Sequence, residues 1–377
     1  MRITDVHFYD IEYKTGTGTI VKNLLLNRDL LSHRYGVDYS CLYRVDTDYR
    51  NAASPVKKGV RRNLRKRLPV FRLAAYFLIP IIWMVKQRKT VEKAVSKSDI
   101  IQAHDLFTAI GLLLLYPHKI NRLAVFFHDN GNPTDMLKSS YSNWNWLEEI
   151  IIQSCHGWLL KRASHIFYVS KHAFQSATDA YKKDSHKFVC LPNSVSVDKL
   201  KRVSVRNDAV KTIITVGTVS RRKRQVDLAK AFENARVRAR LIVLGEGPQL
   251  QELKDIANDC HYCEVQIMGS VSRELVNQFY TEAHVYAMAS LNEGLPMSVL
   301  EAMAASLPIA TVRTDGISDI VTNNINGCVT DDLEQLVAQI NNTSIKELEK
   351  MGKNARKTII EKYSLEIWIE TYVGSLS

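Results

Sequence analysis

Two glutamates stand on either side of a Gly-Leu-Pro turn in residues 290–306 (SLNEGLPMSVLEAMAAS). Proline is tolerated at a helix start because its missing N–H would have no partner there, so Pro296 predicts a helix N-terminus, where free N–H groups and the helix dipole favour an anion. Glu293 precedes that helix end, and Glu301 lies about 7 Å beyond it at 1.5 Å per residue. A phosphate flanked by hydroxyl groups, as in a sugar nucleotide, fits this layout. An ordinary loop-to-helix junction with two surface glutamates is the alternative.

A run of four cations, residues 221–224, follows a predicted strand at 212–217. Lys223 lies in this run beside Arg222. Positive charge at the carboxyl end of a strand can hold a diphosphate and stabilise it as a leaving group. A solvated turn before a helix is the alternative interpretation.

The N-terminal half holds weaker candidates. Gly16 and Gly18 follow a first predicted strand, and such a pair lets the backbone approach a phosphate, although an isolated G-x-G is weak evidence. His128 ends an apolar strand, where it could hydrogen-bond a sugar hydroxyl or shuttle a proton, but a lone histidine is more often structural. His104 closes another strand in the same way and carries less weight.

Short apolar strands alternate with amphipathic helices in the C-terminal half, which predicts βαβ units on a parallel sheet. The strands of this half are expected at 212–217, 239–245, 265–268, 284–289 and 308–312. Ligands bind outside the carboxyl ends of such strands, so the loops at Gly217, at 245–248 and at Glu293 should share one edge. The N-terminal half shows a similar pattern, and the polar residues 194–210 are expected to link the two domains.

The composition is that of a soluble globular protein of two domains, with 377 residues, 46% hydrophobic and 24% charged. No signal-peptide pattern opens the chain. The six cysteines are scattered, so free thiols and no metal site are expected. Hydrolase, metalloprotease, P-loop and EF-hand motifs are absent from the sequence.

Positive charge is concentrated in the N-terminal half. Residues 1–205 hold 32 Lys/Arg against 17 Asp/Glu, whereas residues 206–377 hold 19 against 22. No carboxylate occurs from Tyr49 to Val91, so residues 57–89 form a basic segment that predicts an anionic partner. A net acidic C-terminal half and the lack of a nucleic-acid-binding motif disfavour nucleic acid.

The basic segment encloses an apolar run, Leu73 to Val85, which is too short to span a bilayer. Pro80 is predicted to interrupt any helix through this run, and residues 60–72 could form a basic amphipathic helix. These features favour docking of residues 57–89 on an anionic membrane surface. A buried core helix with solvated basic flanks is the alternative.

The segments VGTVSRRK, LGEGP and MGSV, the two-glutamate window and DGISDIV occur in this order from about 211 to 330. In order and spacing they resemble the family 4 retaining glycosyltransferases, which have the α/β GT-B fold: two Rossmann-like domains facing each other across a cleft. The N-terminal half matches more loosely. The resemblance implies an acceptor-binding domain at 1–200, joined by a C-terminal helix at 364–377, and a nucleotide-sugar-binding domain at 201–363.

The resemblance also implies roles for individual residues. The expected catalytic residues are Glu293, His128 and Lys223. In the family pattern, Glu293 corresponds to the residue that contacts the donor sugar, His128 to the cleft histidine and Lys223 to the diphosphate lysine. Glu301 is expected at the ribose hydroxyls. The full set expected to bind the donor is Gly16, Gly18, Gly217, Arg222, Lys223, Gly269, Val271, Glu293, Gly294, Leu295, Pro296 and Glu301.

Two positions depart from the family pattern. Thr218 stands where relatives usually carry an arginine, and Arg222 is a candidate to replace that charge. The loop at Gly16 and Gly18 lacks the adjacent glycines common in relatives.

The resemblance implies a retaining hexosyltransferase that uses a UDP- or GDP-linked sugar and needs no other cofactor and no metal. The expected acceptor is a glycan or a lipid-linked or surface-polysaccharide intermediate. The protein is expected to be cytoplasmic and peripherally associated with the inner face of the membrane. A sugar-nucleotide epimerase of the same fold and a degenerate, non-enzymatic glycan-binding protein are the alternatives.

Overall fold

The computed structural model describes residues 1–7, 16–43, 69–128, 132–135, 138, 144–197, 200, 210–314 and 316–376. The chain forms two compact units, one of residues 1–191 and 371–377 and the other of residues 192–370. The first unit therefore ends before the boundary that the sequence predicts after residue 200. Most of the predicted linker, 194–210, lies outside the described residues.

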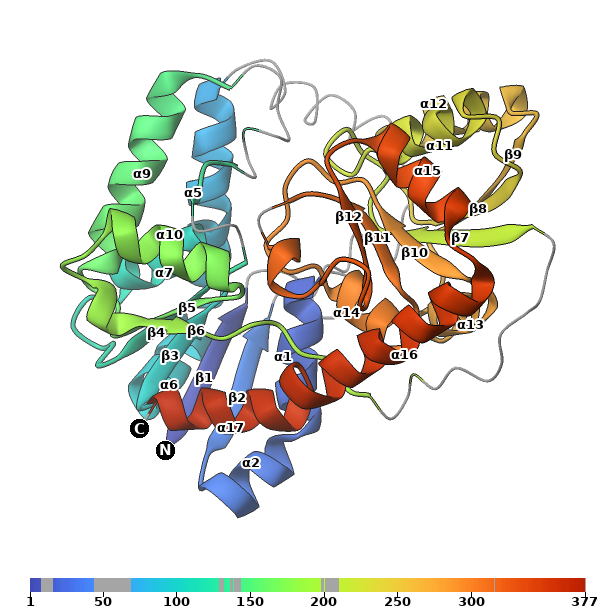
Figure 1. The fold of residues 1–377 in the computed structure, drawn as a ribbon. Helices are drawn as coiled ribbons and strands as arrows, with labels where there is room; N and C mark the ends of the chain where they lie inside the picture. Colours follow the sequence, from blue (N-terminus) through green and yellow to red (C-terminus); the bar gives the residue numbers. More distant parts are fainter. Residues whose placement is uncertain are drawn as a thin grey trace. The chain divides into compact units, whose positions relative to one another are not determined.

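The first unit is built on a parallel sheet of six strands in the order β2-β1-β3-β4-β5-β6 (Figure 1). The strands are β1 (Arg2–His7), β2 (Asp38–Tyr43), β3 (Ile100–Ala103), β4 (Leu123–Phe127), β5 (His165–Tyr168) and β6 (Phe188–Cys190). Both β3 and β4 are buried along their whole length, as expected for parallel strands covered by helices on both faces. Strand β2 was not predicted from the sequence, because it mixes polar and apolar residues and is only partly buried.

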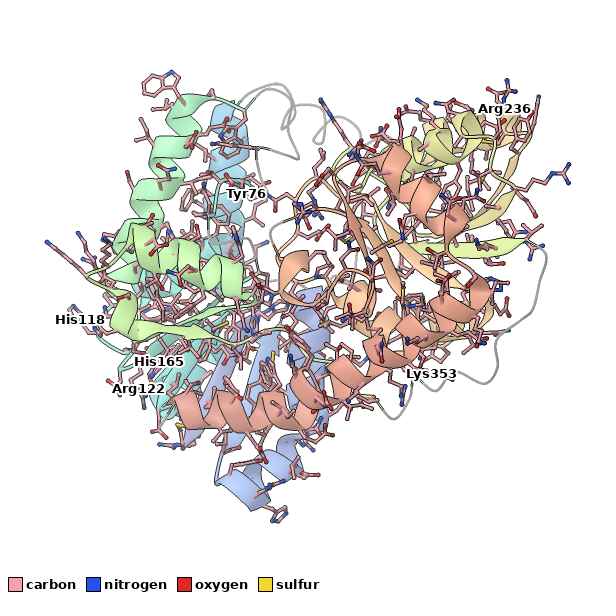
Figure 2. The ribbon with its side chains drawn as sticks, viewed as in Figure 1. Tyr76, His118, Arg122, His165, Arg236 and Lys353 are labelled. Atoms are coloured by element: carbon pink, nitrogen blue, oxygen red, sulfur yellow. The ribbon has the colours of Figure 1, made fainter. Side chains whose placement is uncertain are left out.

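Helices connect these strands. They are α1 (Gly16–Leu26), α2 (Arg28–Tyr35), α5 (Pro69–Lys86), α6 (Arg88–Lys97), α7 (Leu106–Leu115), α9 (Trp146–Leu160) and α10 (Lys171–Ala180). The chain returns to this unit at Thr371, within α17 (Leu365–Leu376). There Tyr372 donates a hydrogen bond to Gln102 on β3, 2.5 Å away. Arg122 bonds to the carbonyl of Leu376 and to His165, and Figure 2 labels Arg122 and His165.

The predicted interruption at Pro80 is wrong, because α5 runs through Pro80 without a break. A proline inside a helix removes one backbone hydrogen bond and crowds the preceding turn. Packing against α7 offsets that cost here: the Tyr76 ring stacks on Phe107 with centroids 4.9 Å apart, and Pro80 itself is buried. The basic residues 57–68 lie outside the described part of the chain.

The second unit contains another six-stranded parallel sheet, in the order β12-β11-β10-β7-β8-β9. Its strands are β7 (Lys211–Val216), β8 (Ala239–Leu244), β9 (Cys263–Gly269), β10 (Val285–Met288), β11 (Ile309–Val312) and β12 (Gly327–Thr330). Its helices are α11 (Gln225–Asn234), α12 (Leu250–Asp259), α13 (Arg273–Glu282), α14 (Met297–Ala304), α15 (Leu333–Asn342) and α16 (Ile345–Lys362). The five strands that the sequence predicts for this half are confirmed, and β12 is an additional edge strand.

Strand order locates a ligand site in each sheet. The chain builds β7, β8 and β9 in one direction and then returns to the other side of β7 to add β10. At such a reversal the connecting helices lie on opposite faces, which leaves a crevice at the strand ends where open α/β sheets bind ligands. The same reversal occurs between β1 and β3 in the first sheet.

None of the helices in the described ranges combines the length and the apolar character that crossing a bilayer requires.

Candidate functional site

Three strands of the second unit, β7, β8 and β9, end at glycines with positive φ. Gly217 follows β7 with φ of 145°, and Gly245 follows β8 with φ of 144°. The Gly245 amide donates to the carbonyl of Gly269, 2.7 Å away at the end of β9. A Cβ at Gly245 would lie 2.0 Å from the carbonyl oxygen of Gly217. Glycine is therefore required at Gly245 both by its backbone conformation and by its neighbour.

The loops after β7 and β10 meet at a buried ion pair. Glu293 is 7% exposed, and its Oε1 lies 2.6 Å from Nζ of Lys223 and 2.7 Å from a guanidinium nitrogen of Arg222. The same nitrogen of Arg222 donates to the carbonyl of Asn292, 2.8 Å away. The Lys223 stem passes over Gly217, where an added Cβ would touch it at 3.6 Å. Glu293 is thus in contact with Lys223 and Arg222, which the sequence places in a different loop.

The protonation state of Glu293 follows from its surroundings. Burial, the largest influence, raises the pKa of the carboxyl group, but the charges of Lys223 and Arg222 outweigh it and lower the pKa below 4.5. Opposite charges within hydrogen-bonding distance favour the ionised form of a carboxyl group. Glu293 is therefore a carboxylate at neutral pH, and it holds both cations beside the end of β10.

The N-terminus of α14 lies next to this carboxylate. Pro296 occupies the N-cap position, as the sequence predicts. Gly294 and Leu295 are buried, and their amides donate no hydrogen bond to any residue in the described ranges. Buried backbone N–H groups are rarely left without a partner, and at a helix N-terminus they form a site for an anion.

The loop after β11 completes this part of the edge. Gly316 packs on Gly294 so closely that an added Cβ would lie 1.2 Å from its carbonyl oxygen. Nearby, Oδ1 of Asn292 and Oγ1 of Thr314 are buried with no hydrogen-bond partner among the described residues. The site therefore offers a ligand hydrogen-bond donors, which are the unbonded amides, and hydrogen-bond acceptors, which are these two side-chain oxygens.

Glu301 lies further along α14 and has its own partner. Its Oε1 is 2.6 Å from a guanidinium nitrogen of Arg273, the first residue of α13. Burial raises the pKa of Glu301, and the charge of Arg273 opposes that effect only in part. Arg273 comes shortly after Gly269 and Val271, so this ion pair links the end of β9 to α14. Arg273 was not among the predicted site residues, because nothing in the sequence indicates that α13 starts beside Glu301.

In the first unit, His128 belongs to a chain of buried polar groups. Asp5 on β1 accepts hydrogen bonds at its Oδ2 from Nε2 of His104 at 2.7 Å, from Gln102 at 2.9 Å and from Tyr39 at 2.8 Å. Nδ1 of His104 lies 3.1 Å from Nε2 of His128, and the two rings stack with centroids 5.4 Å apart. The carboxylate can only accept, so Nε2 of His104 carries a proton toward Asp5.

The charges along this chain are coupled. Burial raises the pKa of Asp5, but the neighbouring His104 outweighs it, and the net pKa is lowered. Burial, helped by the charges of His104 and His7, holds the pKa of His128 well below 6.5. His128 is therefore a neutral imidazole, and one hydrogen bond joins it to His104. From the sequence, His104 carried less weight than His128, although both stand at strand ends, and the structure joins the two.

The glycine pair of the first unit lies at the start of α1, which begins at Gly16. Gly18 is buried, and residues 8–15, between β1 and this helix, lie outside the described residues. The glycine pair therefore lies in the first turn of the helix that follows β1.

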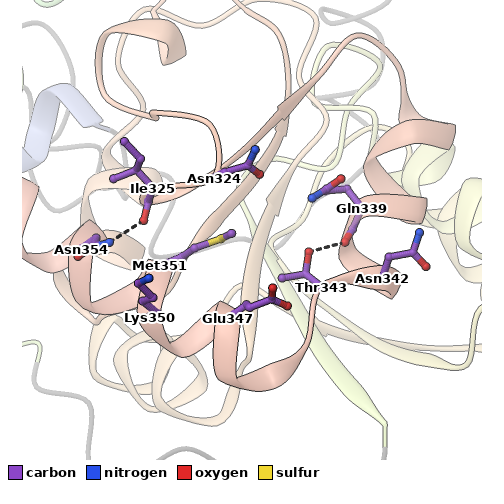
Figure 3. A pocket seen from close by; sticks show the side chains of 9 residues that line it. All are labelled: Asn324, Ile325, Gln339, Asn342, Thr343, Glu347, Lys350, Met351 and Asn354. Carbon is purple, nitrogen blue, oxygen red and sulfur yellow. Dashed lines mark hydrogen bonds between the residues drawn. The ribbon is translucent and has the colours of Figure 1, made fainter.

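A polar hollow of about 330 Å³ lies elsewhere in the second unit, between α15 and α16 (Figure 3). Two of its side chains, Asn354 and Thr343, hydrogen-bond to the carbonyls of Ile325 and Gln339. It contains none of the predicted site residues. In the described part of the chain, no group of three or more His, Cys, Asp or Glu side chains could hold a metal ion.

Glu293→Gln is expected to lower the free energy of unfolding at neutral pH by about 1–3 kcal/mol, since a neutral amide replaces a carboxylate that bonds two cations. The folded pKa of Glu293 is lowered from 4.5, so the charged form contributes stability above that pH and loses it as pH falls through the folded pKa. The difference between wild type and variant should therefore shrink below about pH 4.5 in urea unfolding at a series of pH values. Glu361→Gln, at an exposed pair with Lys357, serves as the control and should change stability little. A pH-independent difference would contradict the assignment.

His104→Phe is expected to raise the pKa of His128, because one of the charges that lower it is removed. The pKa should stay below 6.5, since burial remains the largest cause. An NMR titration of the imidazole signals measures both effects, with His165→Phe on β5 as the control. An unchanged pKa of His128 in His104→Phe would show that the two rings are not coupled.

Comparison with known proteins agrees with this architecture. Residues 34–199 match the family described as Glycosyltransferase Family 4, and residues 196–358 match the family described as Glycosyl transferases group 1. The alpha-monoglucosyldiacylglycerol synthase of Acholeplasma laidlawii is 32% identical over 155 residues, which cover 39% of this chain and 38% of the relative. The sulfoquinovosyl transferase of Arabidopsis thaliana is 28% identical over 177 residues, 41% of this chain and 34% of the relative. The chain thus spans about a third of the length of these curated relatives.

Solved structures share the fold at low sequence identity. Sucrose-phosphate synthase from Thermosynechococcus elongatus superposes with a TM-score of 0.74 at 14% identity, covering 100% of this chain and 98% of that one. HepE of Anabaena, solved in complex with UDP-glucose, gives a TM-score of 0.68 at 14% identity, covering 100% and 99%. The fold is therefore the α/β GT-B architecture with two Rossmann-like units. Since the two family matches follow one another from residue 34 to residue 358, the chain belongs to glycosyltransferase family 4.

Proposed function

We propose that this protein is a retaining glycosyltransferase that moves a hexosyl group from a nucleotide-sugar donor to an acceptor. The observation that carries the proposal is the buried Glu293 carboxylate, held by Lys223 and Arg222 beside the unbonded amides of Gly294 and Leu295. At this reversal of strand order the residues provide one negative charge, two positive charges and a helix N-terminus with unbonded amides. These groups are complementary to the hydroxyl groups and phosphates of a sugar diphosphate.

Each group has a part in the proposed reaction. The N-terminus of α14 holds a donor phosphate, and Lys223 and Arg222 stabilise the diphosphate as it departs. Arg222 supplies the charge that Thr218 does not, and its bond to Glu293 supports that assignment. Glu293 then orients the sugar through its hydroxyl groups, while Glu301 meets the ribose and the loop at Gly269 and Val271 meets the base.

The first unit contributes His128 and the acceptor site in this proposal. The neutral His128 imidazole can accept or donate a hydrogen bond at a sugar hydroxyl, and Gly16 and Gly18 allow the backbone near α1 to approach a ligand. His104 and Asp5 act through His128 as positioning residues. Their support is the hydrogen-bonded chain that fixes the His128 ring.

Nucleoside diphosphate sugars, UDP- or GDP-linked, are the proposed donors, with no further cofactor. One relative, from Mycobacterium tuberculosis, is named as a GDP-mannose-dependent phosphatidylinositol monomannoside mannosyltransferase and is 30% identical over 131 residues, while HepE was solved with UDP-glucose. The proposed acceptor is a lipid-linked or surface-polysaccharide intermediate at the cytoplasmic face of the membrane. Curated relatives named for glycolipid products support that class.

Lys223→Ala is expected to lower the rate of sugar transfer by about 10²–10³-fold, because one charge that stabilises the leaving group is lost. Transfer from a panel of UDP- and GDP-sugars, followed by product analysis, measures the effect. Arg221→Ala provides a matched control, since Arg221 lies in the same loop but is exposed. Equal rates for Lys223→Ala and wild type would overturn the site assignment. An epimerised donor as the product would favour the epimerase, and no turnover of any donor would favour a binding protein.

Neutralising Arg61, Arg62, Arg65, Lys66 and Arg67 is expected to abolish flotation with vesicles rich in anionic lipid, since each basic residue near such a surface contributes about 1 kcal/mol. These residues lie outside the described ranges, so the expectation rests on their sequence. The control neutralises five exposed lysines of α16 instead, namely Lys346, Lys350, Lys353, Lys357 and Lys362. Equal flotation of both variants would contradict docking through residues 57–89.

A further inference from the structure

An apolar groove lies between two helices of the first unit. Phe77 and Ile81 of α5 form one wall, Cys155 and Trp158 of α9 form the other, and α7 forms the floor with Ile110 and Leu114. The cavity has a volume of about 560 Å³, within the range of about 300–1,000 Å³ that is usual for ligand sites. Figure 1 shows α5 and α9 side by side. We refer to this cavity as the α5–α9 groove.

Close packing of α5 on α7 keeps one wall of the groove in place. A Cβ at Gly111 would lie 2.4 Å from the Met84 side chain and 3.2 Å from that of Ile81, so glycine lets α5 approach the floor. The Phe77 ring meets Phe107 of α7 edge-on with centroids 5.0 Å apart, and Tyr76 (labelled in Figure 2) stacks on the same ring. The wall is therefore fixed by aromatic contacts.

The three helices that form the groove also carry exposed apolar side chains. Leu78 and Ile82 of α5, Leu114 of α7 and Ile150 of α9 are each at least half exposed, at 51%, 50%, 57% and 50%. No charged residue occurs in α7, and among the described residues that line the groove the one hydroxyl group is that of Ser154. Exposed apolar side chains gathered around an apolar cavity mark a binding surface on a water-soluble fold.

Positive charge stands at the ends of the two helices that form the groove walls. Lys86 ends α5, and Arg88 and Lys89 begin α6 directly after it. Lys161 and Arg162 follow α9, where the Arg162 guanidinium lies over the Trp158 ring at 4.1 Å from its centroid. An occupant with an apolar body and a negatively charged end complements this arrangement, and each methylene group it buries contributes about 0.8 kcal/mol.

We propose that the α5–α9 groove binds one hydrocarbon chain of an anionic membrane lipid. The chain lies along α7 between Phe77 and Trp158, and the head group stays at the basic rim. This inference deepens the proposed function and rests on its membrane-surface part, not on the transfer chemistry. It assigns a second binding site to the first unit, separate from the histidine chain at the strand ends.

Quenching of tryptophan fluorescence by a brominated lipid tests the groove directly. The probe is lysophosphatidylglycerol with bromine in the middle of its acyl chain, used below its micelle concentration, so that binding needs neither a membrane nor sugar transfer. Wild type should show saturable quenching, and most of it should disappear in Trp158→Phe but not in Trp146→Phe, because Trp146 is 72% exposed at the start of α9.

Filling the groove should block the lipid. Ser154→Phe is expected to weaken the apparent affinity about tenfold or more, equivalent to about 1.4 kcal/mol. Gln153→Phe, an exposed neighbour on α9 that does not line the groove, adds the same side chain and should leave the affinity unchanged. Circular dichroism confirms that each variant is folded.

Three results would overturn the proposal. One is the absence of quenching at Trp158, and another is equal affinity in wild type and Ser154→Phe. The third is a wild-type dimer that Ser154→Phe converts to a monomer without any effect of lipid, which would assign the groove to a second copy of the chain. Flotation with anionic vesicles separates the two levels: a protein that floats without quenching at Trp158 docks on membranes but does not take up a lipid chain. A protein that transfers sugar without binding the probe keeps its enzymatic function and loses this site.

Discussion

All strands of a parallel sheet end at the same edge, and this constraint determines where each unit can place a site. A helix must cross a face of the sheet before the next strand begins, so the loops at the carboxyl ends are the places where side chains from distant segments can meet. The order of the second sheet puts the loop after β7 beside the loop after β10, although Lys223 and Glu293 are 70 residues apart in the chain. In the first sheet the same geometry brings the end of β3 beside the ends of β1 and β4, where His104, Asp5 and His128 are connected.

Buried charge is costly, and the two sites meet that cost in different ways. Glu293 is held by two full positive charges, so it stays ionised in spite of its burial. Asp5 accepts hydrogen bonds from the neutral side chains of Gln102 and Tyr39 and from the imidazole of His104. The other ring nitrogen of His104 is hydrogen-bonded to His128. The first arrangement gathers positive charge that an anionic ligand can share. The second fixes the orientation of a ring and keeps it neutral.

Helix α5 illustrates how tertiary packing overrides a local signal. Pro80 removes a backbone hydrogen bond in the middle of an 18-residue helix, yet the helix continues because Tyr76, Phe77 and Met84 pack on α7. Gly111 permits that approach. Helices α5 and α9 both lie against α7, and an apolar space remains between them. From the sequence, the apolar run of residues 73–85 was interpreted as either a membrane-docking segment or a core helix. In the structure, some of its side chains are packed and others are exposed.

Much of the second unit could be predicted from the sequence, because its strands are short, apolar and separated by clear helical patterns. The same holds for the helix that begins after Pro296 and for the set of residues at its edge, since strand ends and glycine positions are local features. The first unit was predicted less well: β2 mixes polar and apolar residues, and its place beside β1 depends on long-range pairing that no local pattern reveals.

The amino-acid sequence by itself determined the alternation of strands and helices, the position of the helix start at Pro296, and the family to which the chain belongs, because these depend on residue types and spacing along the chain. Only the tertiary structure decided which partners the charged groups have. Arg273 of α13 meets Glu301 of α14 across 28 positions of the sequence. Neighbouring strands bring His104 to Asp5 and His128, which are 99 and 24 positions away. Such contacts follow from strand order and register, which are set by the packing of the whole sheet.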